Sequence, residues 1–357
     1  MSDPSMHKEY LLSALAQAQL GRGLCAPNPS VGAVAVQHGQ IIAKAWHEGA
    51  GSPHAEQVLL SRIPPSNQET TLYVTLEPCN HWGRTPPCVE AIIAHGIKCV
   101  VFAYKDPNPI VAKNHTPTIL RQHGIEVIHY PLPEIDRFYQ SYHYWMQTHK
   151  PWVTVKMAQS LDGYIAGACG KRVQISNAAC GVFTHEQRKA CDVILTTSRT
   201  ILQDNPQFTV RLDANKVESK PLAVLDAHLS LGQNVSALQW AKQGHIYYDS
   251  RKVVQAPHKG CQYYPIPMQE KGLDLDAVLG HLGALGYHDV WVEAGAQLFT
   301  ALHHAHLVQR TYIYISPHII GHTGLSLYSK LTSWHKSQAM SWQVMDDNVI
   351  LTIDWSF

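Results

Sequence analysis

The chain has 357 residues, and its 28 lysines and arginines nearly balance its 27 aspartates and glutamates, which gives a net charge of +1. A single hydrophobic core stops growing at about 250–300 residues, so this length predicts two domains. The near-zero charge, without a run of Lys or Arg, argues against a nucleic-acid partner. A small anionic substrate is still compatible with this composition, because a few local cations suffice to bind it.

The N-terminal segment does not have the pattern of a signal peptide, because it carries Asp3 and Glu9 and lacks a long apolar stretch. No apolar run approaches the ~20 residues that a membrane-spanning helix needs. We therefore expect a cytoplasmic protein without a membrane partner. In such a protein the eight cysteines are expected to be free thiols or metal ligands.

Strand-like and helix-like segments alternate over the first part of the chain, as is typical of an α/β domain with a mostly parallel sheet. Strands are expected at residues 31–36, 41–46, 71–76, 98–104 and 125–130. Helices are expected at residues 54–62, 87–96 and 116–124.

The alternation restarts near Lys150 and Pro151, so we expect an α/β domain at residues 1–149 and another at 150–357. In the second domain, strands are expected at residues 152–163, 192–197, 221–227, 245–249, 289–295 and 310–316. Helices are expected near residues 177–190, 274–285 and 296–304.

Four polar residues of the first domain form a candidate metal site. His54 and Glu56 begin a predicted helix, and Cys79 and Cys88 lie between a predicted strand and the helix after it. Such segments meet at one edge of the sheet, where α/β folds place their sites. One His and two Cys supply three zinc ligands, and a catalytic zinc typically leaves its fourth position to water. Glu56 would lie beside the metal and could carry a proton from water to a leaving amine.

Taken singly, each of these residues has a simpler interpretation. A lone His at a helix start is more often a cap or a surface residue, and two such Cys are more often unrelated buried thiols. A Glu in a first turn commonly only complements the helix dipole. Together and in order, with Pro78 and Pro87 directly before the cysteines, they match the zinc-deaminase signature.

The segment TLEPCNHWGRTPPC, residues 75–88, has a longer gap than the Cys-x-x-Cys of cytidine, nucleic-acid and tRNA-adenosine deaminases. It closely resembles the deaminase half of the bifunctional riboflavin-biosynthesis deaminase–reductase family. Residues 27–34, 51–56 and 105–112 resemble the same family in order. This resemblance implies a cytidine-deaminase-like three-layer α/β fold, a zinc ion and a pyrimidine nucleotide substrate.

The same resemblance implies which residues contact the substrate. It implies contacts from Asn28, His47, Asp106 and Asn108, and a ribose or phosphate contact from Arg84. Turn formation within Pro-Asn-Pro segments is the alternative role for the two asparagines. The family's glycine-rich turn after Ala112 is missing here, so this loop is expected to differ.

The second domain has no Gly-x-Gly-x-x-Gly after a predicted strand, which disfavours a Rossmann dinucleotide site. Residues 155–163, 192–211 and 290–298 instead resemble, in order, the reductase half of the same family. The resemblance implies a dihydrofolate-reductase-like fold that uses NADPH.

Cations and an acid of the second domain are candidate substrate contacts. Lys156, Arg188 and Arg211 are available to a substrate phosphate or carbonyl oxygen, and Glu293 ends a predicted strand. By resemblance, Arg188, Arg211 and Glu293 belong to the substrate side. A solvated surface cation is the alternative for each arginine.

The cofactor side is expected at Gln174, Thr200, Asp204 and Gly295. Gly295 precedes a predicted helix whose free N–H groups suit a phosphate of NADPH, and Asp204 has the alternative role of a turn former. Two departures from the family lie here: Arg172 replaces a Ser, and Gln174 replaces a cofactor-side Trp. The loss of the aromatic removes a stacking surface, and the arginine adds charge.

The sequence therefore predicts a bifunctional enzyme. The resemblance implies zinc-dependent deamination of the diaminohydroxyphosphoribosylaminopyrimidine, followed by NADPH-dependent reduction of the ribosyl group to ribityl. We expect a homo-oligomer, dimer or tetramer. The alternatives are a deaminase with a degenerate reductase domain, motivated by Arg172 and Gln174, a nucleic-acid base deaminase, and a purely structural zinc protein.

Overall fold

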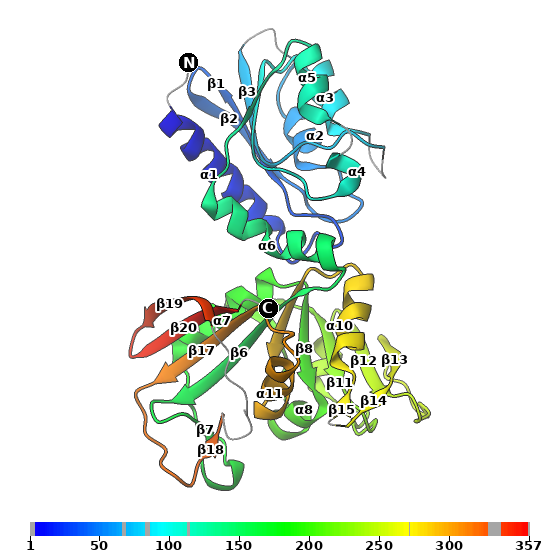
Figure 1. Ribbon diagram of the computed structural model, residues 1–357, viewed down its shortest axis with the longest axis vertical. Helices are drawn as coiled ribbons and strands as arrows, with labels where there is room; N and C mark the ends of the chain where they lie inside the picture. The colour runs from blue at the N-terminus through cyan, green and yellow to red at the C-terminus, as the bar shows by residue number, and fades with distance from the viewer. Residues whose placement is uncertain are drawn as a thin grey trace. The chain divides into compact units, whose positions relative to one another are not determined.

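Each half of the chain has its own sheet and its own hydrophobic core (Figure 1). The structure, a computed structural model, describes residues 4–65, 69–82, 86–112, 115–270, 272–327 and 337–355. It divides into two compact units, Met1–His149 and Lys150–Phe357. No helix in the described part of the chain is long and apolar enough to cross a membrane.

The first unit is built on one five-stranded sheet in the order β2-β1-β3-β4-β5. The strands are β1 Gly32–Gln37, β2 Gln40–Trp46, β3 Thr70–Leu76, β4 Cys99–Tyr104 and β5 Glu126–His129. β3, β4 and β5 pair in parallel. β1 pairs antiparallel with both β2 and β3, so β1 alone runs against the other four strands, and the sheet is otherwise parallel as expected. The tight connection at residues 37–40 forces β1 and β2 into a hairpin.

Helices cover both faces of this sheet, which makes three layers (Figure 1). The helices are α1 Pro4–Gly21, α2 Ala55–Leu60, α3 Cys88–Ala94, α4 Pro109–Ala112, α5 Thr116–Gln122 and α6 Pro133–Thr148. α1 and α6 lie on one face, and α2, α3 and α5 lie on the other. At Gly32 a Cβ atom would collide with the Ala14 carbonyl oxygen, so only glycine lets α1 lie this close to β1.

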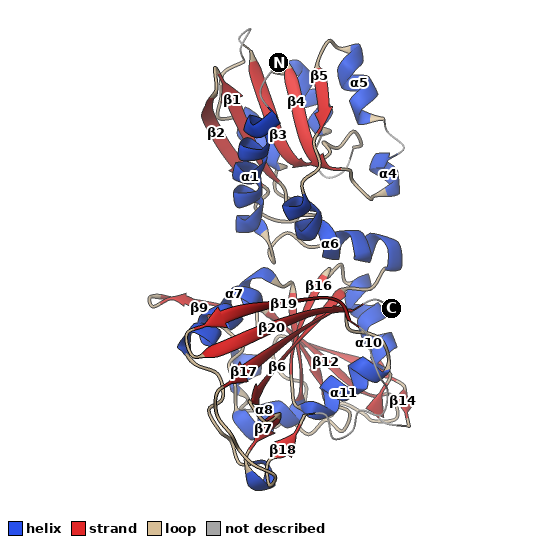
Figure 2. Ribbon diagram, turned by 60° about the vertical axis from the view of Figure 1, so that its left-hand side comes forward, coloured by secondary structure: helices blue, strands red, loops and turns tan. Residues whose placement is uncertain are grey.

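The second unit is built on a nine-stranded sheet in the order β13-β12-β11-β8-β16-β6-β17-β20-β19 (Figure 2). The strands of this sheet are β6 Trp152–Ser160, β8 Val193–Thr197, β11 Pro221–Leu225, β12 Gln243–Asp249, β13 Cys261–Ile266, β16 Asp289–Glu293, β17 Arg310–Ser316, β19 Ser337–Met345 and β20 Asn348–Trp355. Strands from β13 to β17 pair in parallel, and β20 and β19 add antiparallel to that edge.

Short strand pairs and helices complete the second unit. The short strands are β7 Tyr164–Ala166, β9 Val210–Asp213, β10 Lys216–Glu218, β14 Met268–Gln269, β15 Gly272–Leu273 and β18 Leu325–Ser326. The helices are α7 Ala178–Ala190, α8 Ser198–Asp204, α9 Ser236–Trp240, α10 Leu275–Ala284 and α11 Ala296–His304, with a 3-10 turn η1 at Ala168–Gly170. α10 and α11 pack against one face of the sheet through Leu279, Leu282 and Leu302. α8 and α9 pack against the other face through Ile201 and Leu238.

Candidate active sites

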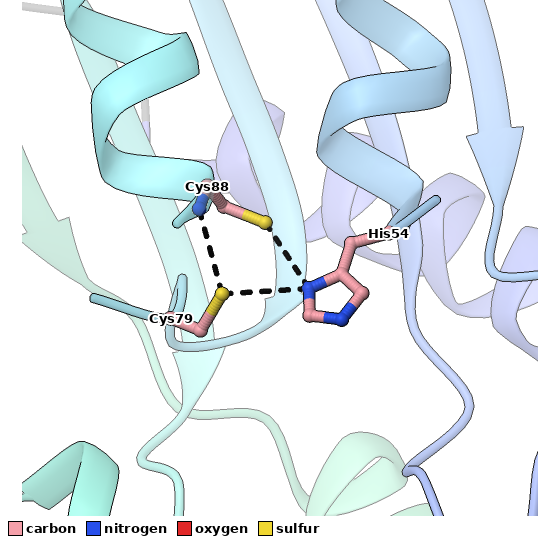
Figure 3. A group of neighbouring side chains, drawn as sticks. All are labelled: His54, Cys79 and Cys88. Atoms are coloured by element: carbon pink, nitrogen blue, oxygen red, sulfur yellow. Dashed lines mark hydrogen bonds between the residues drawn. The ribbon is translucent and has the colours of Figure 1, made fainter. Parts of the chain in front are cut away.

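Three expected metal ligands of the first unit lie together (Figure 3). His54 is the N-cap of α2, Cys88 is the first residue of α3, and Cys79 lies in the loop after β3. His54 Nδ1 is 3.4 Å from Cys79 Sγ and 3.3 Å from Cys88 Sγ. The three ligand atoms all lie within 4.8 Å of one another.

This geometry fits a zinc ion. Zinc–sulfur and zinc–nitrogen bonds of tetrahedral sites place neighbouring ligand atoms about 3.4–3.8 Å apart, close to the separations from His54 Nδ1 to both sulfurs. Among the described residues, no fourth His, Cys, Asp or Glu joins this group. Three protein ligands are the number found at catalytic zinc sites, which leave one position for water.

The two thiols also form a hydrogen bond with each other. The Cys88 side chain donates to Cys79 and lowers the pKa of the Cys79 thiol to about 4, in spite of burial, and His54 adds to the lowering. The same bond raises the pKa of Cys88 above its usual value. The Cys88 backbone N–H also donates to Cys79 Sγ at 3.4 Å. Cys79 is thus prepared as a thiolate before any metal arrives.

Glu56 lies in the first turn of α2, and its side chain is 3% exposed. Burial, together with the negative charge at Cys79, raises the pKa of Glu56 to about 7. A carboxyl group that titrates near neutral pH is suited to both accepting and releasing a proton.

Asn28 and His47 extend this site. His47 is buried, and its ring lies 5.4 Å from the His54 ring. His47 Nδ1 lies 3.1 Å from the Pro53 carbonyl oxygen, which only accepts, so Nδ1 carries the hydrogen. His47 Nε2 is then the acceptor for Asn28 Nδ2 at 3.2 Å. Burial lowers the pKa of His47 and favours this neutral ring. The Asn28 side chain is therefore oriented with its oxygen free of His47.

Asp106 and Asn108 follow β4 at the same edge of the sheet, because β3 and β4 are parallel and pair Leu76 with Tyr104. The Asn108 backbone N–H donates to Asp106 Oδ1 at 2.9 Å, and Asn108 Oδ1 accepts from the Ile110 N–H at 3.0 Å. Asn108 thus serves a turn, which was the alternative role for it. Burial raises the pKa of Asp106 to about 6. Arg84 lies outside the described residues.

Tyr142 was not among the expected site residues, but it donates to Asp106 Oδ1 from α6 at 3.2 Å. The two residues are 36 positions apart. Only the packing of α6 against the sheet brings them together, so no local motif marks this pair.

All eight residues expected at the second site line one cavity of about 1860 Å³. They are Lys156, Gln174, Arg188, Thr200, Asp204, Arg211, Glu293 and Gly295. They come from the middle of β6, from the carboxyl end of β16, from α7, α8 and β9, and from the loops before α7 and α11. Parallel α/β sheets bind ligands at this end of their strands.

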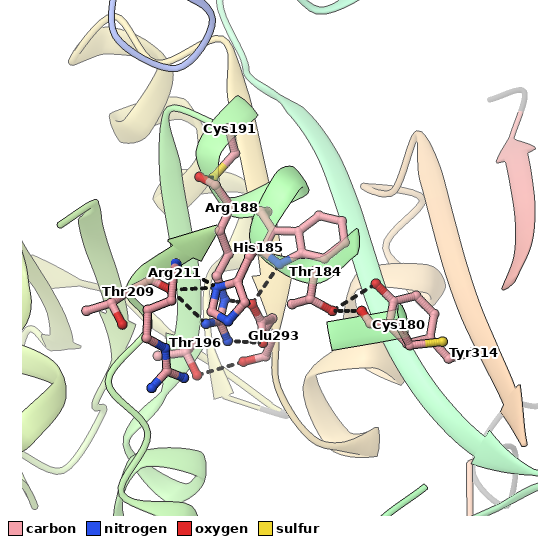
Figure 4. A network of polar contacts seen from close by, with 11 residues as sticks. Cys180, Thr184, His185, Arg188, Cys191, Thr196, Thr209, Arg211, Glu293 and Tyr314 are labelled. Atoms are coloured by element: carbon pink, nitrogen blue, oxygen red, sulfur yellow. Dashed lines mark hydrogen bonds and ion pairs between the residues drawn. The ribbon is translucent and has the colours of Figure 1, made fainter. Parts of the chain in front are cut away.

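Arg188 and Glu293 are bound to each other within this cavity (Figure 4). Arg188 Nε and Nη2 donate to the two Glu293 carboxylate oxygens at 2.6 and 2.9 Å. Trp291 Nε1 donates to Glu293 Oε1 at 2.8 Å, and Arg188 Nη1 donates to the Thr209 carbonyl at 3.0 Å. Although burial alone would raise it, Arg188 holds the pKa of Glu293 at about 2. Arg188 and Glu293 therefore form an ion pair, and a substrate would contact the pair and not two separate charges.

Lys156 and Arg211, two further cations of the cavity, do not take part in this ion pair. Lys156 pairs in register with Glu293 across β6 and β16, and its Nζ lies 4.9 Å from the centre of the Tyr314 ring. Burial lowers the pKa of Lys156. The Arg211 side chain is exposed. Within the described residues, neither cation has a side-chain hydrogen bond or ion pair, so both are available to an anion.

The expected cofactor residues lie at two helix starts, at a helix end and in a loop. Thr200 is in the first turn of α8, where its N–H donates to Thr197 Oγ1 at 3.2 Å, and Asp204 ends that helix. Gly295 is the N-cap of α11. Gln174 Nε2 donates to the Ser176 carbonyl at 2.7 Å, so its amide is engaged within its own loop.

Both units match known families. The cytidine and deoxycytidylate deaminase zinc-binding region matches residues 4–104. The RibD C-terminal domain matches residues 151–351. The chain therefore joins a deaminase-type zinc-binding domain to a RibD-type C-terminal domain, and this confirms the expected fold class.

The whole chain has close relatives. It is 34% identical over 325 residues to the riboflavin biosynthesis protein RibD of Aquifex aeolicus (strain VF5), with 90% of this chain and 89% of that protein covered. It is 34% identical over 335 residues to the protein of that name from Escherichia coli (strain K12), with 87% and 88% covered. The chain belongs to the RibD family of bifunctional riboflavin-biosynthesis deaminase–reductases.

Solved structures agree with this membership. Acinetobacter baumannii RibD, form 1, matches with a TM-score of 0.86 and 28% identity, covering 99% of this chain and 100% of that chain. The Thermotoga maritima diaminohydroxyphosphoribosylaminopyrimidine deaminase/5-amino-6-(5-phosphoribosylamino)uracil reductase matches with a TM-score of 0.87 and 28% identity, covering 99% of each chain.

Proposed function

We propose that the first unit hydrolytically deaminates the diaminohydroxyphosphoribosylaminopyrimidine in a zinc-dependent reaction, and that the second unit reduces the ribosyl group of the product to ribityl with NADPH. The observation that carries the proposal is the three-ligand cluster of His54, Cys79 and Cys88 beside a buried Glu56. A purely structural zinc would need a fourth ligand. The names of the relatives and the match to the RibD C-terminal domain support the second reaction.

In the first reaction, His54, Cys79 and Cys88 hold the metal. A zinc ion there would supply an activated water as the nucleophile that attacks the amine-bearing ring carbon. Glu56 takes a proton from that water and delivers it to the departing amine, so that ammonia leaves. Its pKa of about 7 suits both steps.

Substrate binding in the first unit is proposed for residues around that cluster. Asn28 has its side-chain oxygen available to the substrate, because its nitrogen is engaged by His47. Asp106 and Asn108 approach from the end of β4. Arg84 is proposed as a ribose or phosphate contact on the resemblance alone.

In the second reaction, positioning contributes most, because NADPH itself supplies the hydride. The N–H groups at the start of α11, next to Gly295, suit a cofactor phosphate, and Thr200, Asp204 and Gln174 line the cofactor side. Lys156 and Arg211 supply charge for the phosphorylated substrate, together with the Arg188–Glu293 pair.

The proposed partner is a small pyrimidine nucleotide, and the proposed assembly is a dimer or tetramer in the cytoplasm. Cross-linking or sedimentation of the purified chain tests the assembly.

An assay with the pyrimidine nucleotide and NADPH, reading ammonia and NADPH separately, tests both reactions. Ammonia release followed by NADPH oxidation is expected. Ammonia release without NADPH oxidation would instead support the degenerate reductase, for which Arg172 and Gln174 are the motive. No ammonia release from a zinc-loaded chain would contradict the proposal for the first unit.

A further inference from the structure

Asp106 lies at the edge of the sheet that carries the metal ligands. It comes two residues after β4, and Cys79 comes three residues after the neighbouring parallel strand β3. The Asp106 side chain is 8% exposed. Burial of a carboxylate is unfavourable unless hydrogen bonds compensate for it.

One oxygen of this carboxylate takes both of its hydrogen bonds. Asp106 Oδ1 accepts from the Asn108 backbone N–H at 2.9 Å and from Tyr142 Oη at 3.2 Å. Among the described residues, Oδ2 has no hydrogen-bond donor. Two donors from two different elements fix the rotation of the carboxylate, so the direction of Oδ2 is fixed as well.

Tyr142 reaches this carboxylate from α6, on the other face of the sheet from the metal-bearing helices α2 and α3. Its side chain is 5% exposed. Burial raises the pKa of Tyr142, so the hydroxyl keeps its hydrogen and acts as a donor to the carboxylate.

We propose that Tyr142 is a positioning residue of the deaminase site, which holds Asp106 so that Oδ2 accepts a hydrogen bond from an amino group of the pyrimidine. This inference rests on the proposed function of the first unit. Tyr142 itself does not touch the substrate. Its contribution is to hold the acceptor in place before the substrate arrives, which lowers the ordering cost of binding.

If Tyr142 has only a structural role, its removal should have a different effect. Such a residue would only satisfy its own buried hydroxyl, and its loss would lower the stability of the unit without a selective effect on substrate affinity. The two roles are therefore separated by the effect on KM compared with the effect on kcat and on thermal stability.

The test uses the full zinc-loaded chain and ammonia release from the pyrimidine nucleotide. Tyr142→Phe removes only the hydroxyl, and we expect KM to rise about five- to tenfold, with kcat within about twofold and unchanged zinc content. Tyr10→Phe is the matched control. Tyr10 Oη donates to the Gly39 carbonyl at 2.7 Å, in the turn between β1 and β2, and its loss should leave KM unchanged.

A second variant keeps the proposal testable if Tyr142→Phe does not fold. Asp106→Asn retains an oxygen that accepts from Tyr142 but turns the second position into a donor, so KM should rise about tenfold or more. Adding Tyr142→Phe to Asp106→Asn should then have no further effect, because both act through one contact.

Three results would overturn the inference. These are a wild-type KM for Tyr142→Phe, a wild-type KM for Asp106→Asn, or full additivity of the two substitutions. Each of them would leave the proposed deamination in place. A wild-type chain that holds zinc and releases no ammonia would overturn the proposed function, and this inference with it.

Discussion

Glu56 is a carboxyl group whose surroundings change its chemistry. An exposed glutamate in a first helical turn would be ionised at neutral pH and would mainly complement the helix dipole. Glu56 is instead buried beside Cys79 and Cys88, and burial raises its pKa to about 7. A proton carrier is needed for both halves of a hydrolytic deamination, since water must lose a proton and the amine must gain one.

Glu56→Gln is therefore expected to keep the metal and lose the reaction. The amide fills the same space but carries no proton, so kcat for ammonia release should fall about 10²–10⁴-fold. Zinc content, measured by metal analysis, should stay at about one ion per chain. Glu90→Gln is a matched control, because Glu90 lies in the first turn of the next helix, α3, and is exposed. Near-normal deamination by Glu56→Gln would refute the proton-carrier role.

His54 is proposed as a metal ligand, and the zinc content of a variant tests this role. It supplies the only nitrogen among the three clustered ligand atoms, so His54→Ala should lower the zinc content itself, and deamination should fall with it. His123→Ala, at the exposed end of α5, should leave zinc content unchanged. Full zinc occupancy in His54→Ala would mean that the metal is held elsewhere.

Among the elements, α7 and β16 are tied by the Arg188–Glu293 ion pair. Both side chains are largely buried, with 12% and 13% exposure. Removal of one partner of a buried pair leaves the other charge without compensation, which typically costs about 3–5 kcal/mol. Arg188→Met should therefore lower the free energy of unfolding by about 3 kcal/mol, measured by urea denaturation. An unchanged unfolding midpoint would mean that the pair contributes no net stability.

The Arg188–Glu293 pair makes the stability of the second unit depend on pH. The pKa of Glu293 is about 2 in the folded chain, below its ordinary value of 4.5. The stability that it contributes is therefore fully present above pH 4.5 and is lost as pH falls from there toward about 2. In Glu293→Gln this part of the acid dependence should be absent, so urea midpoints measured across that pH range should fall less steeply than in the wild-type chain.

The expected elements that were correct are those with a strong local signal. All of the strands expected in the second unit are present, because each is a short apolar run between turn residues, as in Val193–Thr197 and Pro221–Leu225. Helices α1 and α6 were not predicted, although α6 supplies Tyr142. Strand β19 was not predicted either, although Met340, Trp342 and Val344 alternate with Ser341 and Gln343, which is the pattern of a strand.

The site residues that lie in local motifs could be predicted to lie together, whereas those that only the fold brings together could not. His54, Glu56, Cys79 and Cys88 lie in two short motifs, so their proximity could be predicted from spacing alone. Arg188 and Glu293 are 105 positions apart, and the sequence offers each as a separate substrate contact. Only the fold shows that they bind each other, because their pairing depends on how α7 packs beside the end of β16.

At the scale of the whole molecule, the chain has two candidate sites, and each is built on a different sheet. The metal cluster is built on the first sheet, and the large cavity is built at the carboxyl ends of the second sheet. Each unit has its own buried core. Damage confined to one site should therefore leave the other reaction intact.

Arg211→Ala tests this independence. Arg211 lies on β9, lines the cavity of the second unit, and has no side-chain partner among the described residues, so its loss should cost little stability. If its guanidinium binds the substrate phosphate, KM for NADPH oxidation with the deaminated substrate should rise about 10- to 100-fold, because hydrogen bonds to charged groups contribute about 1.5–3 kcal/mol. Ammonia release should keep its wild-type KM and kcat.

Arg251→Ala is a suitable control, since Arg251 is an exposed arginine of the same unit that pairs with Asp249. Equal damage to both reactions by Arg211→Ala would mean that the two units do not act separately, whereas an effect on NADPH oxidation alone would assign Arg211 to the second site.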